Sequence, residues 1–396
     1  MINGLIQWWV VGTCPLEFEA HRSVYLSKAW AQSDEVRYVH PMGIAVLGRT
    51  MINKADCPLP ADFGKWAQEG CNLHHVSWIG YCLPSFPRLW RIPGSWWVNE
   101  WPFGCWLRRE MSRYRRKGIP QVVVNFCWVL SWSLRSAKPD LLVYDCSDNF
   151  RSYPREIPLR VDWAESRLAR LSDAVVVSSW SFENRMRRYN PNITHIVNGV
   201  TQELLDNLEP FVLAPNNRGN NKPVIIYHGA TQAWRFNWKL YLSVAALCPQ
   251  YEFKIYTHGK HVPTMLRFPG NVRVLEWLPP QDLCRVLEVC SLGFMPYELA
   301  EPTLSGFPLK MFEYLAAGLP VVSTRLPEVE RFADCVALCD NDPGQAAALI
   351  RTAINNDSAE HRAARRSLAE KYSWPTLARQ YRSGVLSRIA SKVNEA

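Results

Sequence analysis

The sequence predicts an α/β protein made of two doubly wound domains, and three observations lead to this prediction. Its 396 residues are enough for two domains of ordinary size. Short apolar runs alternate with helix-length segments almost throughout, as they do in parallel sheets wound with helices. Some of these runs, such as 174–177, are continuous and rich in valine, which favours strands that are covered on both faces.

A polar segment divides this pattern into two halves. Residues 213–222 are rich in asparagine and glycine and have no apolar period, so they read as a linker. We therefore expect a first domain at 1–210, a linker at 211–222, a second domain at 223–372 and a last helix within 373–396. The expected strands are 5–11, 36–39, 76–79, 121–126, 141–145, 174–178 and 195–197 in the first domain, and 224–227, 252–256, 272–276, 292–295, 321–323 and 336–338 in the second. Ligands of such sheets bind at the carboxyl ends of strands, so we expect the chemistry in the cleft between the domains.

Composition narrows the class of protein. A hydrophobic content of 48% excludes global disorder, and a net charge of +9 favours an anionic partner. No run of ~20 mainly apolar residues suggests a membrane span, and the N-terminus lacks the features of a signal peptide. The 12 cysteines show no CxxC pair and no zinc-ribbon spacing, which favours reduced, mostly buried thiols. These features predict a cytoplasmic protein.

One segment of the second domain carries the most information about function. Pro308 suits the first turn of a helix and Gly318 suits its end, which predicts a helix over 308–317 followed by a strand. Lys310 and Glu313 lie three residues apart and therefore share one face of that helix. A lysine in the first turn, beside free backbone amides, suits a diphosphate, and a carboxylate one turn later can accept two ribose hydroxyls. The alternative is a surface ion pair on an amphipathic helix.

The segment from Ser305 to Val322 resembles the donor-site helix of GT-B glycosyltransferases, in the group that includes family 4. Glu313 matches the second glutamate of the family's E-x7-E pattern, whereas Ser305 stands in the place of the first, and residues 317–322 match its Ala-Gly-x-Pro-Val-Val stretch. The Pro-Leu-Lys-x-Phe-Glu-Tyr form resembles polysaccharide and teichuronic-acid glycosyltransferases. The resemblance implies a GT-B fold, with two Rossmann-like domains facing a central cleft and a C-terminal helix that crosses back to the first domain. It leaves open whether the anomeric configuration is inverted or retained.

Further positions of the donor site follow from this resemblance. Residues 224–230 resemble the family's first C-domain strand and its glycine turn, where Gly229 lets the backbone approach a diphosphate. Residues 272–283 resemble the strand and loop that hold the nucleotide base. We include Ser305 and Gly306 in the donor site, and Arg235 as a second cation for the diphosphate. Lys239 is a further candidate cation; the alternative for both cations is a solvated helix start. We expect no metal and no other cofactor, because Lys310, a helix terminus and Arg235 can supply the positive charge.

The first domain holds the candidates for the general base of glycosyl transfer. Asp145 and Asp148 end a predicted strand that resembles one in membrane-associated glucuronosyltransferases, whose base is an aspartate there. Asp148 is the first choice by position and Asp145 the second; the alternative is a pair of turn-forming residues. His21 lies in Glu19-Ala20-His21, which resembles the E-x-H after the family's first strand. It is a candidate base or sugar contact, or else an ordinary helix-start histidine.

Residues 84–118 combine tryptophan with basic side chains. Trp90, Trp96, Trp97, Trp101 and Trp106 fall there, with Arg88, Arg91, Arg108, Arg109, Arg113, Arg115, Arg116 and Lys117. This combination is typical of an interfacial membrane surface. Two alternatives remain: a tryptophan core under a solvated basic face, or a single-stranded nucleic-acid surface, for which no recognisable motif is present.

Together these features predict a transferase that moves a hexosyl or glycuronosyl group from a UDP-sugar to a saccharide or lipid-linked acceptor in cell-surface polysaccharide or glycoconjugate synthesis. We expect it to act in the cytoplasm, as a peripheral protein on the inner face of the membrane, without nucleic acid. The alternatives are a nucleotide-sugar epimerase of the same fold and a non-catalytic protein that binds sugar nucleotides.

Overall fold

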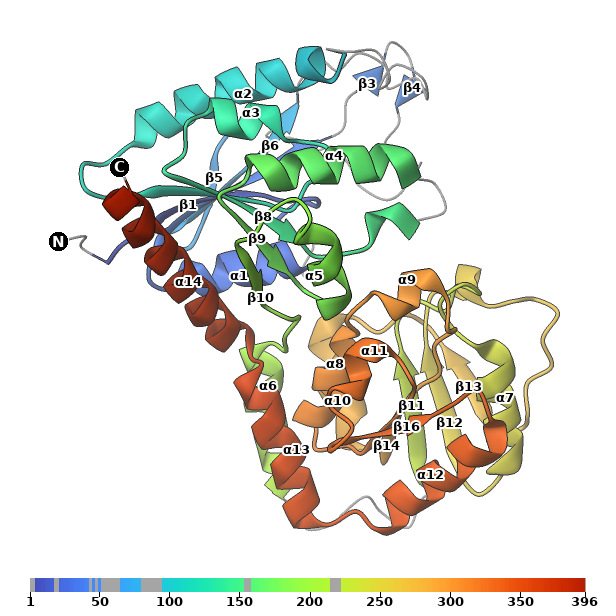
Figure 1. The fold of residues 1–396 in the computed structure, drawn as a ribbon. Coiled ribbons are helices and arrows are strands. Elements are labelled where there is room, and N and C mark those ends of the chain that lie inside the picture. The colour runs from blue at the N-terminus through green and yellow to red at the C-terminus, as the bar shows by residue number, and fades with distance from the viewer. Residues whose placement is uncertain are drawn as a thin grey trace. The chain divides into compact units, whose positions relative to one another are not determined.

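The computed structural model describes residues 4–17, 21–42, 45–46, 49–50, 65–79, 95–152, 158–213 and 222–395 (Figure 1). The chain forms two compact units: an N-terminal unit of residues 1–196 and 378–396, and a C-terminal unit of residues 197–377. The division therefore falls before the predicted linker at 211–222. Residues 211–213 belong instead to helix α6 (Gln202–Leu213) of the C-terminal unit, and 214–221 lie outside the described residues.

The N-terminal unit is built on an eight-stranded sheet. Its order is β10-β9-β8-β7-β1-β2-β6-β5, and all neighbours are parallel except β5 and β6. The strands of this sheet are β1 (Gln7–Val11), β2 (Glu35–Met42), β5 (Ala67–Glu69), β6 (Leu73–Ile79), β7 (Gln121–Asn125), β8 (Leu141–Cys146), β9 (Ala174–Val177) and β10 (Ile193–His195). The helices are α1 (Arg22–Trp30), α2 (Ser95–Tyr114), α3 (Trp132–Ser136), α4 (Pro158–Leu171), α5 (Trp180–Met186) and the part of α14 (Trp374–Glu395) from Ala378 on. A separate pair, β3 (Ala45–Val46) and β4 (Arg49–Thr50), was not predicted.

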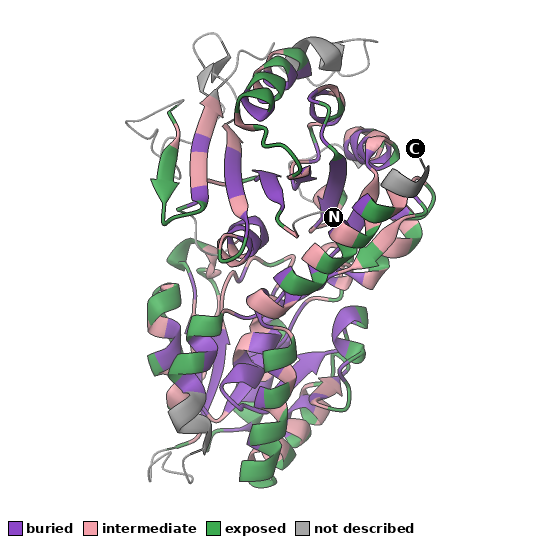
Figure 2. Cartoon of the chain, turned by 90° about the vertical axis from the view of Figure 1, so that its left-hand side faces the viewer, coloured by how far each residue is buried: buried purple, intermediate pink, exposed green. Residues whose placement is uncertain are grey.

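Helices cover both faces of this sheet, so neither side of its central strands is exposed to solvent. β1, β7 and β8 are buried at every residue (Figure 2). On one face, side chains of α2 to α5 pack against Trp9, Val123 and Leu142. On the other, Trp8 stacks on Trp30 of α1 with ring centroids 4.2 Å apart. These contacts place the aromatic residues of β1 in the core.

Helix α14 is fastened to the N-terminal unit by polar and aromatic contacts. The buried Asp34 carboxylate accepts hydrogen bonds from Arg382 of α14 and from the Trp8 indole, at 2.7 and 3.0 Å. The Trp30 indole donates to the Ala378 carbonyl at 3.2 Å, and Tyr381 meets the Trp30 ring edge-on. The part of α14 from Ala378 on is therefore integral to this unit.

The C-terminal unit contains a six-stranded parallel sheet of order β13-β12-β11-β14-β15-β16. Its strands are β11 (Val224–His228), β12 (Glu252–Tyr256), β13 (Val272–Leu275), β14 (Leu292–Met295), β15 (Val321–Thr324) and β16 (Val336–Cys339). Besides α6, its helices are α7 (Trp238–Leu247), α8 (Pro280–Glu288), α9 (Glu301–Leu304), α10 (Leu309–Ala316), α11 (Pro327–Glu330), α12 (Pro343–Asn355) and α13 (Ala359–Lys371). The predicted class of two doubly wound α/β domains is confirmed.

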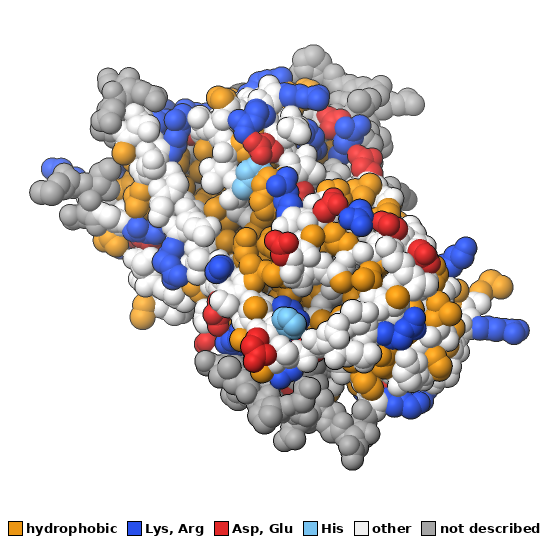
Figure 3. Space-filling model, turned by 60° about the horizontal axis from the view of Figure 1, so that its bottom comes forward, with side chains coloured by type: hydrophobic (Ala, Val, Ile, Leu, Met, Phe, Trp, Pro, Cys, Tyr) orange, Lys and Arg blue, Asp and Glu red, His pale blue; other side chains and the backbone are white. Residues whose placement is uncertain are grey.

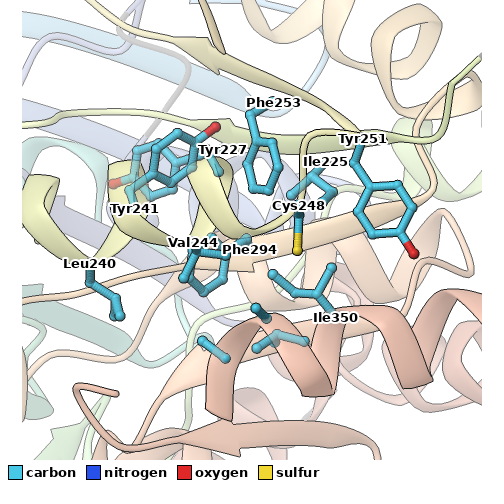
Figure 4. Close-up of a cluster of buried hydrophobic side chains, with 14 of the residues drawn as sticks. Ile225, Tyr227, Leu240, Tyr241, Val244, Cys248, Tyr251, Phe253, Phe294 and Ile350 are labelled. Carbon is cyan, nitrogen blue, oxygen red and sulfur yellow. The ribbon is translucent and has the colours of Figure 1, made fainter. Parts of the chain in front are cut away.

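The core of the C-terminal unit lies between this sheet and helices α7 and α12. Figure 4 shows Tyr227, Phe253 and Phe294 of the strands beside Tyr241 of α7, with Ile350 of α12 closing the cluster. The order of the sheet reverses at β11, because β12 and β13 extend to one side of it and β14 to β16 to the other. Ligands of such sheets bind at this reversal, so the carboxyl ends of β11 and β14 mark the expected site.

The structure corrects part of the predicted aromatic surface. Trp106 of α2 is partly buried and packs on the core beside Phe103 and Trp78, so it belongs to the core rather than to the surface. Trp101 is 51% exposed, and Arg108, Arg109 and Arg113 are exposed on the same helix. Residues 84–94 and the side chains of 95–99 lie outside the described residues, so Trp90, Trp96 and Trp97 are not placed. No helix in the described part of the chain is both long and apolar enough to span a bilayer.

Candidate functional site

The structure brings Gly229 and Lys310 together at the reversal point of the C-terminal sheet. Gly229 follows β11 with φ +119°, a conformation that side chains disfavour. A Cβ atom at this position would lie 3.2 Å from the Lys310 Nζ, so the missing side chain opens the space into which the ammonium group points. Helix α10 begins after Pro308, which is the N-cap rather than the first helical residue, and ends before Gly318 with φ +67°, in the predicted turn.

Two tyrosines hold the Lys310 ammonium group. Its Nζ donates a hydrogen bond of 2.9 Å to the Tyr297 hydroxyl, and it lies 4.7 Å from the centre of the Tyr227 ring. Burial lowers the pKa of Lys310, but Tyr227 and Tyr297 outweigh this effect and the net direction is upward. Lysine 310 is therefore charged at neutral pH. Tyr297 follows β14, and we did not predict its role.

Arg235 is the second cation of this site. It lies close enough to Lys310 for its charge to lower the Lys310 pKa, against the net upward direction. Its Nε is buried and has no hydrogen-bond partner, while its guanidinium group lies 4.9 Å from the centre of the Trp234 ring. Lys239 is exposed on α7. Two cations beside a glycine turn, one with an unsatisfied buried donor, form a site that suits an anion.

Glu313 lies one helical turn beyond Lys310 and faces His228, the last residue of β11. The His228 Nε2 and Glu313 Oε2 atoms are 3.1 Å apart, and the Glu313 side chain keeps 24% of its surface exposed. Burial raises the pKa of Glu313, but His228 and Lys310 oppose it, and the net direction is downward. Glu313 is therefore an ionised carboxylate that can still accept hydrogen bonds from a ligand.

Ser305 and Gly306 connect α9 to α10. The Ser305 hydroxyl donates to the Glu301 carbonyl at 2.8 Å, and the Gly306 amide donates to the Thr303 carbonyl at 3.3 Å. In this structure both residues shape the loop before α10; their contact with a donor stays a prediction.

An aromatic pair stands at the carboxyl ends of β12 and β13. His258 stacks on Trp277 with ring centroids 4.6 Å apart and planes 3° apart, and Trp277 is 38% exposed. We predicted the nucleotide base near residues 272–283 but did not single out these two rings. A flat, exposed aromatic surface of this kind suits a nucleobase.

In the N-terminal unit, His21 is the N-cap of α1 and lies near Asp148. Its Nδ1 is 3.3 Å from the Ser23 backbone nitrogen and 2.9 Å from the Ser23 hydroxyl, and its Nε2 is 3.1 Å from the Thr13 hydroxyl. Burial lowers the His21 pKa to about 4, and the charge of Asp148 acts in the opposite direction. The two candidates are thus electrostatic neighbours, and His21 is neutral at pH 7. Glu19 and Ala20 lie outside the described residues.

The two candidate aspartates, one near the end of β8 and one just after it, differ in their surroundings. Asp145 is fully buried, and its two carboxylate oxygens pair with the Arg22 guanidinium group at 3.0 to 3.2 Å. Burial raises the pKa of Asp145 and Arg22 opposes that effect. Asp148 is partly exposed, and its Oδ1 accepts a hydrogen bond of 2.8 Å from the Asn149 amide. A base must reach the acceptor hydroxyl, and of the two only Asp148 has accessible surface.

No group of three or more His, Cys, Asp or Glu side chains among the described residues is arranged to hold a metal ion.

Figure 3 shows one face of the molecule, on which Lys and Arg side chains are interspersed with acidic and hydrophobic ones.

Comparison with known proteins places this geometry in a structural class. The chain aligns over 96% of its length with 99% of Anabaena HepE in complex with UDP, at 14% identity and a TM-score of 0.65. It aligns over 98% of its length with 99% of an alpha,alpha-trehalose-phosphate synthase (UDP-forming) from Burkholderia vietnamiensis, at 11% identity and a TM-score of 0.64. The chain has the GT-B fold. This confirms the fold that the α10 segment implied.

Sequence comparison adds the type of enzyme that this GT-B chain resembles. Residues 222–356 match the family described as glycosyl transferases group 1, and this range contains Gly229, Arg235, Lys310 and Glu313. A putative teichuronic acid biosynthesis glycosyltransferase of Bacillus subtilis strain 168, TuaH, is 25% identical over 275 residues. That alignment covers 61% of this chain and 66% of the relative, slightly less than two thirds of its length.

Proposed function

We propose that this protein is a glycosyltransferase that transfers a sugar from a UDP-sugar to a saccharide or lipid-linked acceptor. The arrangement of Lys310, Arg235 and Glu313 around Gly229 carries this proposal. It presents two cations to a diphosphate and, one helical turn away, an ionised carboxylate to a ribose. The printed descriptions of the relatives support the same class, since HepE is described with UDP and glucose and TuaH with teichuronic acid biosynthesis.

The donor end of the reaction needs stabilisation of the leaving group. As the bond between the anomeric carbon and the diphosphate oxygen breaks, negative charge grows on that oxygen, and Lys310 and Arg235 neutralise it. Because both groups are held by neighbouring aromatic rings, little reorganisation accompanies this step. These cations supply the charge that a divalent ion would otherwise supply, and we propose that none is required. The His258–Trp277 pair supplies a stacking surface for the base.

The acceptor end needs a group that removes a proton. In our proposal Asp148 takes the proton of the acceptor hydroxyl. The oxygen of that hydroxyl forms the new bond to the anomeric carbon, and the nucleoside diphosphate leaves. Asp145 does not take part, because Arg22 holds it in the core, and this buried pair fixes α1 against the end of β8. His21 contacts the substrate rather than acting as the base, because its pKa of about 4 makes it a weak proton acceptor.

Release of UDP from a panel of UDP-sugars, with and without oligosaccharide acceptors, tests this proposal. We expect Asp148→Asn to lower turnover about 10²–10⁴-fold, the usual contribution of a general base, without weakening UDP binding. Asp334→Asn, which changes an exposed carboxylate between α11 and β16, is the matched control and should leave turnover unchanged. Absence of turnover with every donor, despite UDP binding, would favour the non-catalytic alternative.

We also propose that the exposed side of α2 contacts an anionic membrane surface. Arg108 and Arg113 are exposed there, while Phe103, Leu107 and Met111 of the same helix pack into the core. Each cation near an anionic leaflet contributes ~1 kcal/mol, so changing both to glutamine should weaken vesicle binding about 30-fold.

Flotation with phosphatidylserine-containing vesicles measures this effect. Arg285→Gln combined with Lys260→Gln removes the same charge from exposed positions of the C-terminal unit and serves as the control. Equal flotation of the two double variants would overturn the assignment of this surface.

A further inference from the structure

The N-terminal unit holds a cavity between α14 and the side of the sheet that faces away from α2 to α5. Its volume is about 370 Å³, which is within the usual range for pockets that bind small molecules. It is lined by residues of β8, β9, β10 and α14, all of which belong to the N-terminal unit. None of the lining residues is part of the candidate donor site or is a candidate base, so this cavity is a separate feature.

Helix α14 borders the cavity with small side chains. Gly384, Ser387 and Ser391 line it, and the first two of these residues are exposed. A Cβ atom at Gly384 would have no other atom within 4 Å, so close packing does not require a glycine at this position. A glycine inside a helix is less stable there than alanine would be. The missing side chain therefore lowers the stability of the helix and leaves the mouth of the cavity open.

Arg388 brings a positive charge to the cavity. Its Nε is buried without a hydrogen-bond partner, and in the described part of the chain no carboxylate forms an ion pair with its guanidinium group. Arg382, earlier in α14, pairs with Asp34 at 2.7 Å. Lys392, later in the same helix, pairs with Asp173 at 2.6 Å. An unpaired, partly buried cation beside an open cavity suits a ligand that carries a negative charge.

The strands give the cavity an apolar floor. Leu141 and Val143 of β8 and Val176 of β9 line it and are at most 4% exposed. A bare inorganic anion would leave this apolar surface in contact with water, whereas an alkyl chain would cover it. The cavity therefore combines one cation with a surface that favours a hydrocarbon.

We propose that this cavity binds an amphiphilic anion, in which a phosphate or carboxylate head is joined to a short alkyl chain. The head pairs with Arg388, because the planar fork of N–H donors in a guanidinium group matches either anion. The chain covers the apolar floor formed by β8 and β9. No step of the proposed transfer reaction enters this proposal, so it holds whether or not the protein transfers a sugar.

Calorimetric titration of the full-length protein with hexyl phosphate tests the proposal. Excess UDP is present, so that the diphosphate site of the C-terminal unit is occupied. We expect saturable binding that is stronger than binding of inorganic phosphate or of hexanol, each of which lacks half of the ligand. Arg388→Gln should weaken it about 10- to 150-fold, the usual contribution of a charge-assisted hydrogen bond to a phosphate. Arg379→Gln removes an exposed cation of the same helix that does not line the cavity, and it should bind hexyl phosphate normally.

A second variant blocks the cavity without changing its charge. Gly384→Leu places a side chain in the open mouth and should abolish binding of hexyl phosphate, while the Tm stays the same or rises because leucine favours a helix. Ser383→Leu adds the same side chain at the neighbouring exposed position, which does not line the cavity, and should bind as the wild type does. The proposal would be overturned by equal affinity of the wild type and Arg388→Gln, by equal affinity for hexyl phosphate and inorganic phosphate, or by the absence of saturable binding.

Vesicles that contain phosphatidic acid distinguish a membrane lipid from a soluble molecule as the source of this ligand. Weaker flotation of Gly384→Leu than of Ser383→Leu would identify a lipid. Equal flotation of the two variants, together with hexyl phosphate binding that depends on Arg388, would identify a soluble amphiphile.

Discussion

The Lys310 ammonium group should contribute little to the stability of the free protein and much more to donor binding, and Lys310→Met separates the two effects. The ammonium is partly buried, makes one hydrogen bond to Tyr297 and is repelled by Arg235. No ion pair joins it to a carboxylate in the described part of the chain. Methionine has a similar length and fills the same space between Tyr227 and Tyr297 without a charge.

The two effects differ in size. A charge-assisted hydrogen bond to a phosphate contributes about 1.5–3 kcal/mol, so the variant should bind UDP about 10- to 150-fold more weakly. The raised pKa of Lys310 means that its charge stabilises the folded protein, and loss of the hydrogen bond to Tyr297 costs about 1 kcal/mol of stability. The unliganded variant should therefore be less stable than the wild type by about 1 kcal/mol. For a domain of 150–250 residues, each kcal/mol corresponds to a Tm shift of about 2–4 °C.

Calorimetric titration with UDP measures the affinity, and thermal unfolding without ligand measures the stability. Lys371→Met is the control, because Lys371 is exposed at the end of α13 and should change neither quantity. If Lys310→Met bound UDP with the affinity of the wild type, Lys310 would be a structural lysine and the reasoning would be refuted.

Three other predictions concern backbone space, pH and metal. Gly12→Ala should lower the free energy of unfolding by about 1–3 kcal/mol, since its methyl group overlaps the Tyr38 hydroxyl, whereas Gly259→Ala, with nothing within 4 Å, should have little effect in the same denaturant titration. The His21 pKa of about 4 in the folded protein lies below its unfolded value of 6.5, so between these two values the unfolded chain binds an extra proton. The free energy of unfolding therefore decreases as the pH is lowered from about 6.5 to about 4. His21→Gln should remove this loss, at most roughly 3 kcal/mol, from the difference between pH 7 and pH 4; an unchanged pH profile would contradict the burial of the ring. Transfer should continue in excess chelator, and a loss of turnover restored by added magnesium would show that the two cations do not suffice.

The features that could be predicted from the sequence were those set by local chemistry. The bounds of α10 depend on Pro308 and Gly318, which are adjacent to the helix they delimit, and the structure confirms this helix to within a residue at each end. The two doubly wound sheets followed from alternating apolar runs, and the strands β1, β7, β8, β14 and β15 among them are buried on both sides. Such signals lie within a few residues of one another and need no knowledge of the rest of the chain.

The features that could not be predicted depend on contacts between distant residues. Asp145 and Asp148 look alike in a strand end, and only Arg22, far away in the sequence, separates the buried carboxylate from the accessible one. His228 lies in residues 224–230, the predicted strand and glycine turn. Its pairing with Glu313 joins β11 to α10, which are far apart in the sequence. Tyr297 follows a predicted strand, and its position at a carboxyl end was the one signal that could have identified it.

Tryptophan was the least informative residue type. Trp8, Trp9 and Trp30 fill the core, and Trp106, whose clustering with arginine suggested a surface, packs against it. A tryptophan ring can lie either in the core or at a surface, because it combines an apolar body with a polar N–H group. Its burial therefore depends on the face of the helix or strand on which it falls, and not on its neighbours in the sequence.

A crystal structure of the complex with UDP tests the central claim most directly. The account predicts that the Lys310 Nζ lies within hydrogen-bond distance of a diphosphate oxygen, that Glu313 accepts the ribose hydroxyls and that the uracil ring lies on Trp277. A nucleotide bound with both Lys310 and Glu313 turned away from it would contradict the account.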